Sequence, residues 1–180
     1  MQQAIFDLQQ DYFQLFGLRQ SFQIDAAQLE QQYRVLQTLV HPDRAAHLPD
    51  ADQRLAMQRS TLVNEAYQTL RSPIRRARYL LSLQGVDTRE DSNTGMPVDF
   101  LMAQMEWREA VADAQQACNA TTLGQLEARL HHETRELEAR LAEKIDTEKN
   151  YAEAAGLVRK LRFMEKTAEE IHAAYDAIDE

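Results

Sequence analysis

The feature that most restricts the fold is the spacing of apolar side chains near the C-terminal end of the chain. Between positions 157 and 178, apolar residues recur at alternating steps of four and three, which is the a/d repeat of helices that pack along a common seam. The stripe consists of Leu157, Leu161, Met164, Ala168, Ile171, Tyr175 and Ile178. Such a repeat predicts a long helix that buries one face against other helices.

The rarity of turn-forming residues extends this prediction to the whole chain. Five glycines and four prolines in 180 residues are too few for an all-β fold, which needs many turns. The sequence also has no glycine-rich strand-to-helix turn, which argues against a doubly wound α/β fold. We therefore predict an all-α protein.

The least helical stretch, QGVDTREDSNTGMP, divides the chain because it combines two glycines, a proline and polar turn formers. It predicts an N-terminal domain at 1–84, a linker at 85–97 and a C-terminal domain at 98–180. Three amphipathic segments in the C-terminal domain predict an antiparallel three-helix bundle. In the N-terminal domain, segments 26–40 and 52–71 flank a polar loop and predict an antiparallel helical hairpin. The predicted stripes are Leu29, Tyr33, Leu36 and Val40 in the first segment, and Leu55, Leu62, Ala66 and Leu70 in the second.

Three residues mark helix ends in the N-terminal domain. Gly17 should end a short helix in DYFQLFGL, because glycine adopts the left-handed conformation of a C-cap. Asp25 is suited to cap the first helix of the hairpin. Pro73 should begin a further short helix, where its missing N–H has no cost.

Charge and cysteine content exclude several functions. The net charge is −9, with −1 in residues 1–95 and −8 in residues 96–180, so we expect no binding to nucleic acid. A single cysteine, Cys118, excludes a disulfide framework and multi-cysteine metal sites. The N-terminus has no basic leader, and no apolar run is long enough to span a bilayer. We therefore expect a cytoplasmic protein without a membrane partner.

The tripeptide His41-Pro42-Asp43 begins the loop between the two helices of the predicted hairpin. By itself it could be only a helix stop, because proline cannot continue the hydrogen-bond ladder. With DYFQLFGL before it and NEAYQTL after it, the arrangement resembles a J-domain, the module that stimulates the ATPase of DnaK-type heat-shock chaperones. The resemblance implies that the tripeptide contacts the chaperone, with Arg34 and Arg44 beside it.

Three longer blocks resemble the HscB family of iron–sulfur cluster co-chaperones: NEAYQTLRSPIRRARYLLSLQG, PVDFLMAQMEWREA and VRKLRFMEK. The resemblance runs from about residue 11 to the end. It implies a J-domain that engages an HscA- or DnaK-type chaperone and a C-terminal bundle that binds the scaffold protein IscU. By position, the scaffold-binding residues are Leu101, Met102, Met105, Glu106, Glu109 and Phe163, whereas Trp107 is expected to pack in the core.

One departure from the J-domain pattern concerns charge. J-domains usually carry a strongly basic helix before the tripeptide, but here Arg34 is its only basic residue. The sequence therefore predicts weak electrostatic docking to the chaperone. A second basic cluster, formed by Arg75, Arg76 and Arg78, is interpreted as a solvated helix face.

Three alternatives remain at the level of sequence. A J-domain protein with a different client would bury the face from Leu101 to Glu109. A helical metal-dependent enzyme would gather His132, Glu136 and another carboxylate in a pocket. A nucleic-acid binder would need the arginine cluster at 75–78 to dominate. Because the sequence has no nucleophile–base pair, phosphate loop or metal cage, we expect no enzymatic activity, no cofactor and no bound metal.

Overall fold

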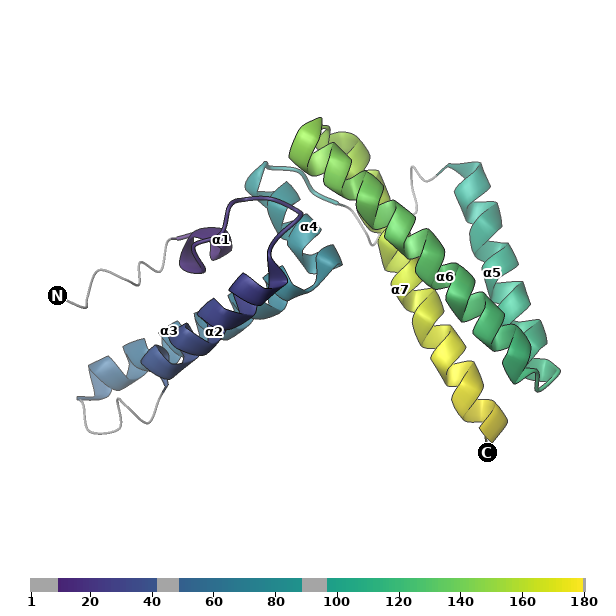
Figure 1. Cartoon of the computed structure of the whole chain (residues 1–180), viewed down its shortest axis with the longest axis horizontal. Coiled ribbons are helices and arrows are strands. Elements are labelled where there is room, and N and C mark those ends of the chain that lie inside the picture. Colours follow the sequence, from purple (N-terminus) through teal and green to yellow (C-terminus); the bar gives the residue numbers. More distant parts are fainter. Residues whose placement is uncertain (1–9, 42–48, 89–96, 180) are drawn as a thin grey trace. The chain divides into compact units, whose positions relative to one another are not determined.

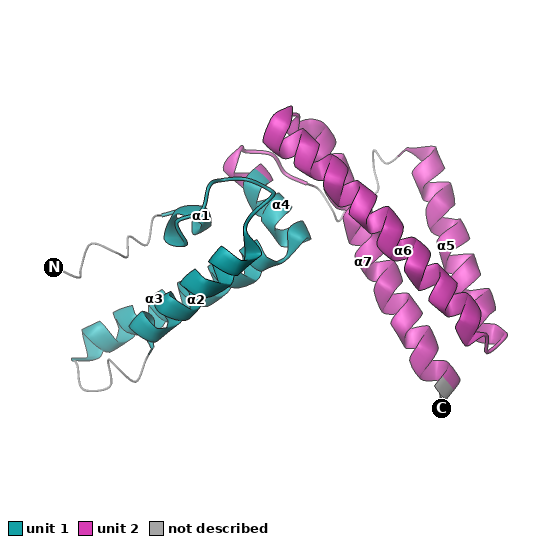
Figure 2. Cartoon of the chain, viewed as in Figure 1, with its two compact units in different colours: residues 1–80 teal, residues 81–180 magenta. Residues whose placement is uncertain are grey.

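The computed structural model describes residues 10–41, 49–88 and 97–179, and every regular element within these ranges is helical (Figure 1). The prediction of an all-α fold is therefore confirmed. The elements are α1 (Tyr12–Leu15), α2 (Ala26–Val40), α3 (Asp50–Arg71), α4 (Pro73–Leu83), α5 (Val98–Gln116), α6 (Ala120–Ala142), the π-helical turn η3 (Glu143–Thr147) and α7 (Tyr151–Asp179). They form two compact units, residues 1–80 and 81–180 (Figure 2).

The N-terminal unit is built around the predicted hairpin, with α2 and α3 side by side (Figure 1). Two aromatic stacks join its elements: Tyr33 of α2 lies on Tyr67 of α3 with ring centroids 3.9 Å apart, and Tyr12 of α1 lies on Tyr79 of α4 at 4.3 Å. The buried apolar side chains are Phe13, Phe16, Phe22, Leu29, Leu36, Val40, Val63, Ala66, Tyr67, Leu70, Ala77 and Leu80. This shared core is the main stabilising term, since burial of apolar surface drives folding.

Local sequence explains where these helices begin and end. The Asp25 carboxylate accepts hydrogen bonds from two backbone N–H groups in the first turn of α2, as an N-cap does. Gly17 has a φ of +64°, and the N–H of Leu18 bonds back to the Phe13 carbonyl at 2.8 Å; this is a Schellman C-cap. Pro73 is the first residue of α4. All three predicted helix signals are confirmed.

The predicted core stripe of α3 is partly wrong. Ala66 and Leu70 are fully buried, but Leu55 and Leu62 are only half-buried. Val63 and Tyr67, which the stripe omitted, are buried instead. The buried residues of α3 thus lie in its C-terminal part, and α1 also packs against this helix. Periodicity alone could not show that the first turns of α3 are only partly covered.

The C-terminal unit is the predicted antiparallel three-helix bundle, in which α5, α6 and α7 each contact the other two (Figure 1). The a/d stripe of α7 faces its partners: Leu157, Leu161, Met164 and Ile171 are buried, and Ala168, Tyr175 and Ile178 are half-buried. Trp107 of α5 is also buried, as expected. One repeat in the sequence thus fixes which face of the longest helix enters the core.

The connection from α6 to α7 contains the π-helical turn η3, which the sequence did not predict. Ile145 in this turn is still buried. Lys144 Nζ lies 2.8 Å from the carboxylates of Glu148 and of Glu153, the latter in the first turn of α7. These hydrogen bonds raise the pKa of Lys144 and lower that of Glu153. The lysine therefore ties the turn to the start of α7.

The division between the two units falls at Leu80–Leu81, within α4. Most of the linker predicted at 85–97 lies outside the described residues, so the predicted domain boundaries at 1–84 and 98–180 stay predictions. Among the described residues, none of the helices combines the length and the apolar character needed to cross a bilayer.

Candidate functional site

The first candidate surface lies at the C-terminal end of α2. The helix ends at Val40, and His41 takes extended backbone angles (φ −57°, ψ 129°), as expected for a residue before proline. The His41 side chain is exposed. The other predicted chaperone contacts on the loop, Pro42, Asp43 and Arg44, lie outside the described residues.

Arg34, the remaining predicted chaperone contact, is paired within the unit. Its Nη2 lies 3.0 Å from Oε1 of Glu30, one turn earlier on α2, and the hydroxyl of Tyr67 on α3 donates to the other oxygen of Glu30. The bonds from Tyr67 and then Arg34 lower the pKa of Glu30. The bond to Glu30 in turn raises the pKa of Tyr67. Arg34 and Glu30 therefore present a neutral pair on α2.

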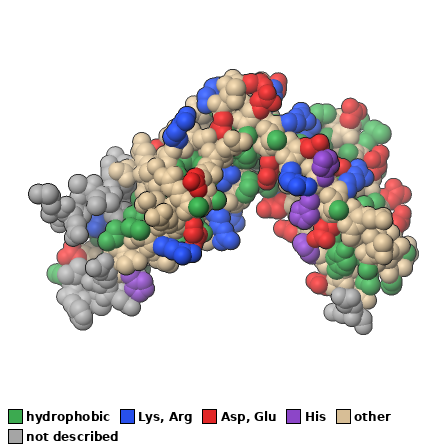
Figure 3. All heavy atoms as spheres, in the orientation of Figure 1, with side chains coloured by type: hydrophobic (Ala, Val, Ile, Leu, Met, Phe, Trp, Pro, Cys, Tyr) green, Lys and Arg blue, Asp and Glu red, His purple; other side chains and the backbone are tan. Residues whose placement is uncertain are grey.

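The arginine cluster on α4 is not a uniform solvated face. Arg75 and Arg78 are exposed, but Arg76 Nη1 donates to the Leu70 carbonyl at 2.6 Å and its guanidinium lies 5.0 Å from the ring centre of Phe22. The interpretation as a solvated face is therefore wrong for Arg76, because the last turn of α3 offers a carbonyl without a helical partner. On the face seen in Figure 3, basic side chains are scattered among acidic ones rather than gathered in a stripe.

The second candidate surface is the outward face of α5. Met102 and Met105 are 55% and 71% exposed, Glu106 and Glu109 are also exposed, and Leu101 is half-buried. The helix buries a different set of residues, namely Phe100, Trp107, Val111 and Ala114. The exposed methionines contradict the burial of this face that the different-client alternative predicts. Large exposed apolar side chains beside charged ones are typical of an interaction surface.

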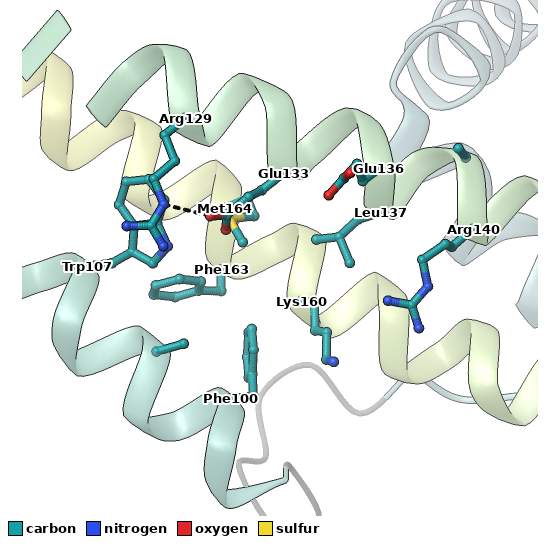
Figure 4. Close-up of a pocket in the computed structure, with 12 residues that line it drawn as sticks. Phe100, Trp107, Arg129, Glu133, Glu136, Leu137, Arg140, Lys160, Phe163 and Met164 are labelled. Atoms are coloured by element: carbon teal, nitrogen blue, oxygen red, sulfur yellow. Dashed lines mark hydrogen bonds and ion pairs between the residues drawn. The ribbon is translucent and has the colours of Figure 1, made fainter. Parts of the chain in front are cut away.

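Phe163, the remaining predicted scaffold contact, lies apart from that exposed face. It is 6% exposed on α7 and meets Phe100 of α5 edge to face, with ring centroids 5.5 Å apart. Both rings line a groove of about 700 Å³ between the three helices (Figure 4). The structure thus places five predicted scaffold contacts along α5 and the sixth in the neighbouring groove.

Charged side chains surround the apolar floor of this groove (Figure 4). Arg129 lies 4.6 Å above the ring of Trp107 and donates to Glu133 at 2.8 Å. Lys160 lies 5.4 Å from the ring centre of Phe100. The sequence does not reveal these lining residues, because they come from three helices and no spacing within one helix indicates a groove between helices.

The residues named for the metal-dependent alternative do not converge. His132 Nε2 lies 3.4 Å from Glu136 Oε1, and both side chains are largely exposed on α6. Within the described part of the chain, no group of three or more His, Cys, Asp or Glu side chains could hold a metal ion. Zinc sites use three or four protein ligands, so this pair alone is an ordinary surface contact.

Comparison with known proteins gives two family matches. Residues 11–79 match the DnaJ domain, and residues 96–172 match the family described as the HSCB C-terminal oligomerisation domain. The matches thus cover the two candidate surfaces separately.

Curated relatives and solved structures agree with these matches. The chain is 51% identical to the "Co-chaperone protein HscB homolog" of Aromatoleum aromaticum, over 96% of this chain and 98% of the relative, and 52% identical to that of Chromobacterium violaceum, over 96% and 97%. Among structures, the chaperone HscB from Vibrio cholerae superposes with a TM-score of 0.85 at 36% identity, covering 92% of this chain and 98% of the other. Human co-chaperone HscB gives 0.88 at 30% identity, covering 93% and 83%.

Proposed function

Because the chain belongs to the HscB family of co-chaperones and carries a J-domain, we propose that it binds the scaffold protein IscU and delivers it to a DnaK-type heat-shock chaperone, of the HscA kind, in iron–sulfur cluster assembly. The J-domain accelerates ATP hydrolysis by the chaperone, and the C-terminal bundle holds the scaffold. In this proposal the chain works in the cytoplasm and has no catalytic activity of its own.

The chaperone side of the proposal depends on the tripeptide after α2. Asp43 forms a charge-assisted hydrogen bond with a basic group of the chaperone, and such a bond is stronger than a neutral one. If this bond forms only in the hydrolysing conformation, it shifts the chaperone toward that conformation. His41, exposed where α2 ends, fixes the direction in which the loop leaves the helix or meets the chaperone itself.

The scaffold side is supported by one observation above all, the exposure of Met102 and Met105 on α5. The Met105 side chain is 71% exposed. Exposing two long apolar side chains three residues apart does not stabilise the bundle. A flexible, polarizable thioether, however, adapts well to a partner surface. Glu106 and Glu109 add negative charge beside them, which favours a partner with basic side chains around an apolar patch.

The two proposed surfaces share no residue, since one belongs to α2 and the loop after it and the other to α5 and α7. In this proposal, one chain uses both surfaces in the same complex. IscU bound to the bundle reaches the chaperone together with the J-domain, which raises its local concentration at the chaperone.

The chaperone side is tested by the steady-state ATPase rate of the cognate HscA-type chaperone, measured alone, with this protein, with IscU and with both. We expect this protein to raise the rate and IscU to raise it further. Asp43→Asn should abolish the stimulation, because the neutral amide loses the charge-assisted bond. Asp50→Asn, an exposed carboxylate in the first turn of α3, is the matched control and should stimulate normally. An Asp43→Asn protein as active as wild type would refute the assigned role.

The scaffold side is tested by calorimetric titration of IscU into this protein. Replacing Met102 and Met105 by serine should weaken binding about tenfold or more, since each loses roughly 1 kcal/mol of apolar burial. Met57→Ser, a methionine 62% exposed on α3, is the control and should bind normally. The double variant should still stimulate the chaperone in the absence of IscU. Unchanged IscU affinity would remove α5 from the proposed interface.

A further inference from the structure

The groove between α5, α6 and α7 has the dimensions of a small-molecule site. Its volume of about 700 Å³ lies within the roughly 300–1,000 Å³ that such sites occupy. Its apolar lining comes from all three helices: Phe100, Ala103, Trp107, Leu137, Phe163 and Met164. Small-molecule sites have the same composition, mostly apolar and aromatic side chains with a few charged groups. The groove therefore has both the size and the lining of a binding site.

Packing within the bundle fixes the walls of this groove. Phe100 and Phe163 meet edge to face with ring centroids 5.5 Å apart. Trp107 is 2% exposed, and the Arg129 guanidinium lies 4.6 Å from the centre of its ring. Side chains that are held by their neighbours keep their rotamers, so a ligand that enters loses little free energy in ordering them. The groove is thus formed before any ligand arrives.

The charges in the lining favour an anion. Three of its ionisable side chains are basic and two are acidic: Arg129, Arg140 and Lys160 against Glu133 and Glu136. Arg129 donates to Glu133 at 2.8 Å, and Glu136 lies 3.4 Å from His132 on the same helix. Both acidic groups therefore already have a basic partner, and the positive charge of the other two basic side chains remains available.

Lys160 and Arg140 carry this available charge. Within the described part of the chain, neither lies within ion-pair distance of a carboxylate. Lys160 instead lies 5.4 Å from the ring centre of Phe100, and Arg140 acts from a longer range on Glu153, which is bonded to Lys144. Figure 4 shows both cations toward the same end of the groove. Residues 96–180 have a net charge of −8, so these two side chains form a local positive site in an acidic unit.

We propose that this groove is a binding site for a small amphipathic carboxylate, an alkyl or aromatic acid with a single negative charge. Its apolar part lies between Phe100, Phe163 and Trp107, and its carboxylate accepts hydrogen bonds from Lys160 and Arg140. Charge-assisted bonds of this kind orient a ligand as well as adding affinity. A second negative charge on the ligand is disfavoured, since two acidic side chains remain in the lining. The inference goes beyond the proposed function, because the site needs neither the chaperone nor the scaffold.

The experiment titrates the full-length protein with three probes that share an alkyl chain and differ in charge: decanoate, decanol and decyltrimethylammonium. All are used near neutral pH, where a carboxylate is ionised, and below the concentrations at which they aggregate. Trp107 is the single tryptophan and lines the groove, so its fluorescence reports occupancy, and calorimetry gives the stoichiometry. We expect decanoate to bind once per chain, decanol about tenfold more weakly, and the cation more weakly still.

Two substitutions separate the head-group contact from the apolar contact. Lys160→Gln keeps most of the side chain but removes its charge, so it should weaken decanoate about tenfold and leave decanol unchanged. Ala139→Phe, at an exposed position in the lining, fills the groove and should abolish the binding of both. Lys166→Gln is the matched control, because Lys166 is exposed on α7 and is not part of the lining. An unchanged helix content by circular dichroism shows that each variant is folded.

Three results would overturn the inference. Decanoate that shows no saturable binding leaves the groove without the proposed ligand. Equal affinity for the three probes, or a loss of decanol binding in Lys160→Gln, means apolar adsorption without a head-group contact. IscU binding that Lys160→Gln and Ala139→Phe both weaken, in a protein that takes up no decanoate, would assign the groove to the scaffold instead. In each case stimulation of the chaperone ATPase is a separate measurement, so the proposed function stands.

Discussion

At the scale of single residues, Cys118 is the clearest case of a side chain in an unfavourable place. It follows the C-cap of α5 with a φ of +48°, and the N–H of Asn119 bonds to the Ala114 carbonyl at 2.9 Å. This is the Schellman geometry that Gly17 and Gly85 adopt in the other unit and at the end of α4. A residue with a Cβ is strained in the left-handed region by roughly 1 kcal/mol.

We therefore expect Cys118→Gly to increase the free energy of unfolding of the C-terminal unit by up to about 1 kcal/mol, the relief of strain exceeding the entropy that glycine loses. Urea unfolding followed by the fluorescence of Trp107, the single tryptophan, measures it. Ala117→Gly is the control, because residue 117 has an ordinary φ of −80° and should lose stability. A destabilised Cys118→Gly protein would mean that the thiol makes a contact worth more than the strain.

The hydrogen bond between Tyr67 and Glu30 predicts a dependence on pH. It lowers the pKa of Glu30 and raises that of Tyr67. A carboxyl whose pKa folding lowers adds stability above its unfolded pKa and loses it as the pH falls through the folded value. A phenol whose pKa is raised adds stability below its unfolded pKa and loses it as the pH rises through the folded value. Both contributions are present near neutral pH.

The test is a titration of the Glu30 carboxyl carbon by NMR in wild type and in Tyr67→Phe. We expect the pKa of Glu30 to rise toward its ordinary value in the variant, and the stability gap between the two proteins to narrow at acidic pH. Tyr33→Phe is the control, since the Tyr33 hydroxyl donates to Asn64 rather than to a carboxylate. A Glu30 pKa that Tyr67→Phe leaves in place would assign the shift to Arg34 alone.

At the scale of elements, the junction of α3 and α4 depends on Arg76. Its guanidinium bonds the Leu70 carbonyl at the end of α3 and lies over Phe22 in the segment before α2, so one side chain joins three parts of the unit. We expect Arg76→Ala to lower the stability of the N-terminal unit by about 1–2 kcal/mol, since charged hydrogen bonds contribute more than neutral ones. Hydrogen exchange of the amides in α2 and α3 measures the loss.

Arg75→Ala is the control, because Arg75 is exposed on the same helix and should have little effect. The Trp107 unfolding transition should be unchanged in both variants, because it reports the other unit. Equal protection of the α2 and α3 amides in Arg76→Ala and wild type would show that the junction does not depend on this arginine.

The helices were largely predictable from sequence because their determinants are local. Caps at Asp25 and Gly17, the start at Pro73 and the seam of α7 each lie within a few residues of their effect. The errors arise where a second element decides the outcome. In α3, Val63 and Tyr67 are buried while Leu55 is only half-buried, because burial depends on which neighbouring elements cover each part of the helix. The π-helical turn η3 was not predicted, yet Ile145 within it is still buried.

The candidate surfaces were predictable in a different way. The positions on α5 came from resemblance to a family, and periodicity alone would have allowed Met102 and Met105 to be core residues; their exposure is a tertiary fact. The groove beside Phe163 and the hydrogen bond from Tyr67 of α3 to Glu30 of α2 depend on contacts between helices, which no single-sequence pattern contains. The role of Pro42 and Asp43 in binding the chaperone remains a prediction from sequence.

At the scale of the whole molecule, the chain divides into two compact units, and the two proposed surfaces are divided between them. Because contacts within each unit define it as compact, we expect a defect in the buried residues of one unit to lower the stability of that unit alone. Leu161 on α7 is 1% exposed, and truncating a fully buried leucine to alanine costs about 2–5 kcal/mol. Leu161→Ala should therefore lower the free energy of unfolding measured from Trp107 fluorescence by that amount. The transition should move to a lower urea concentration.

In the same full-length variant, amide protection in α2 and α3 should be unchanged. The concentration of this protein that gives half-maximal stimulation of the chaperone ATPase without IscU should equal that of wild type. Leu70→Ala, a fully buried leucine of the N-terminal unit, is the reciprocal control: it should reduce protection in α2 and α3 and spare the Trp107 transition. If Leu161→Ala lowers the protection of both units equally, the chain unfolds as one cooperative body. Stimulation of the chaperone would then depend on the integrity of the bundle, and the two activities could not be separated by mutation.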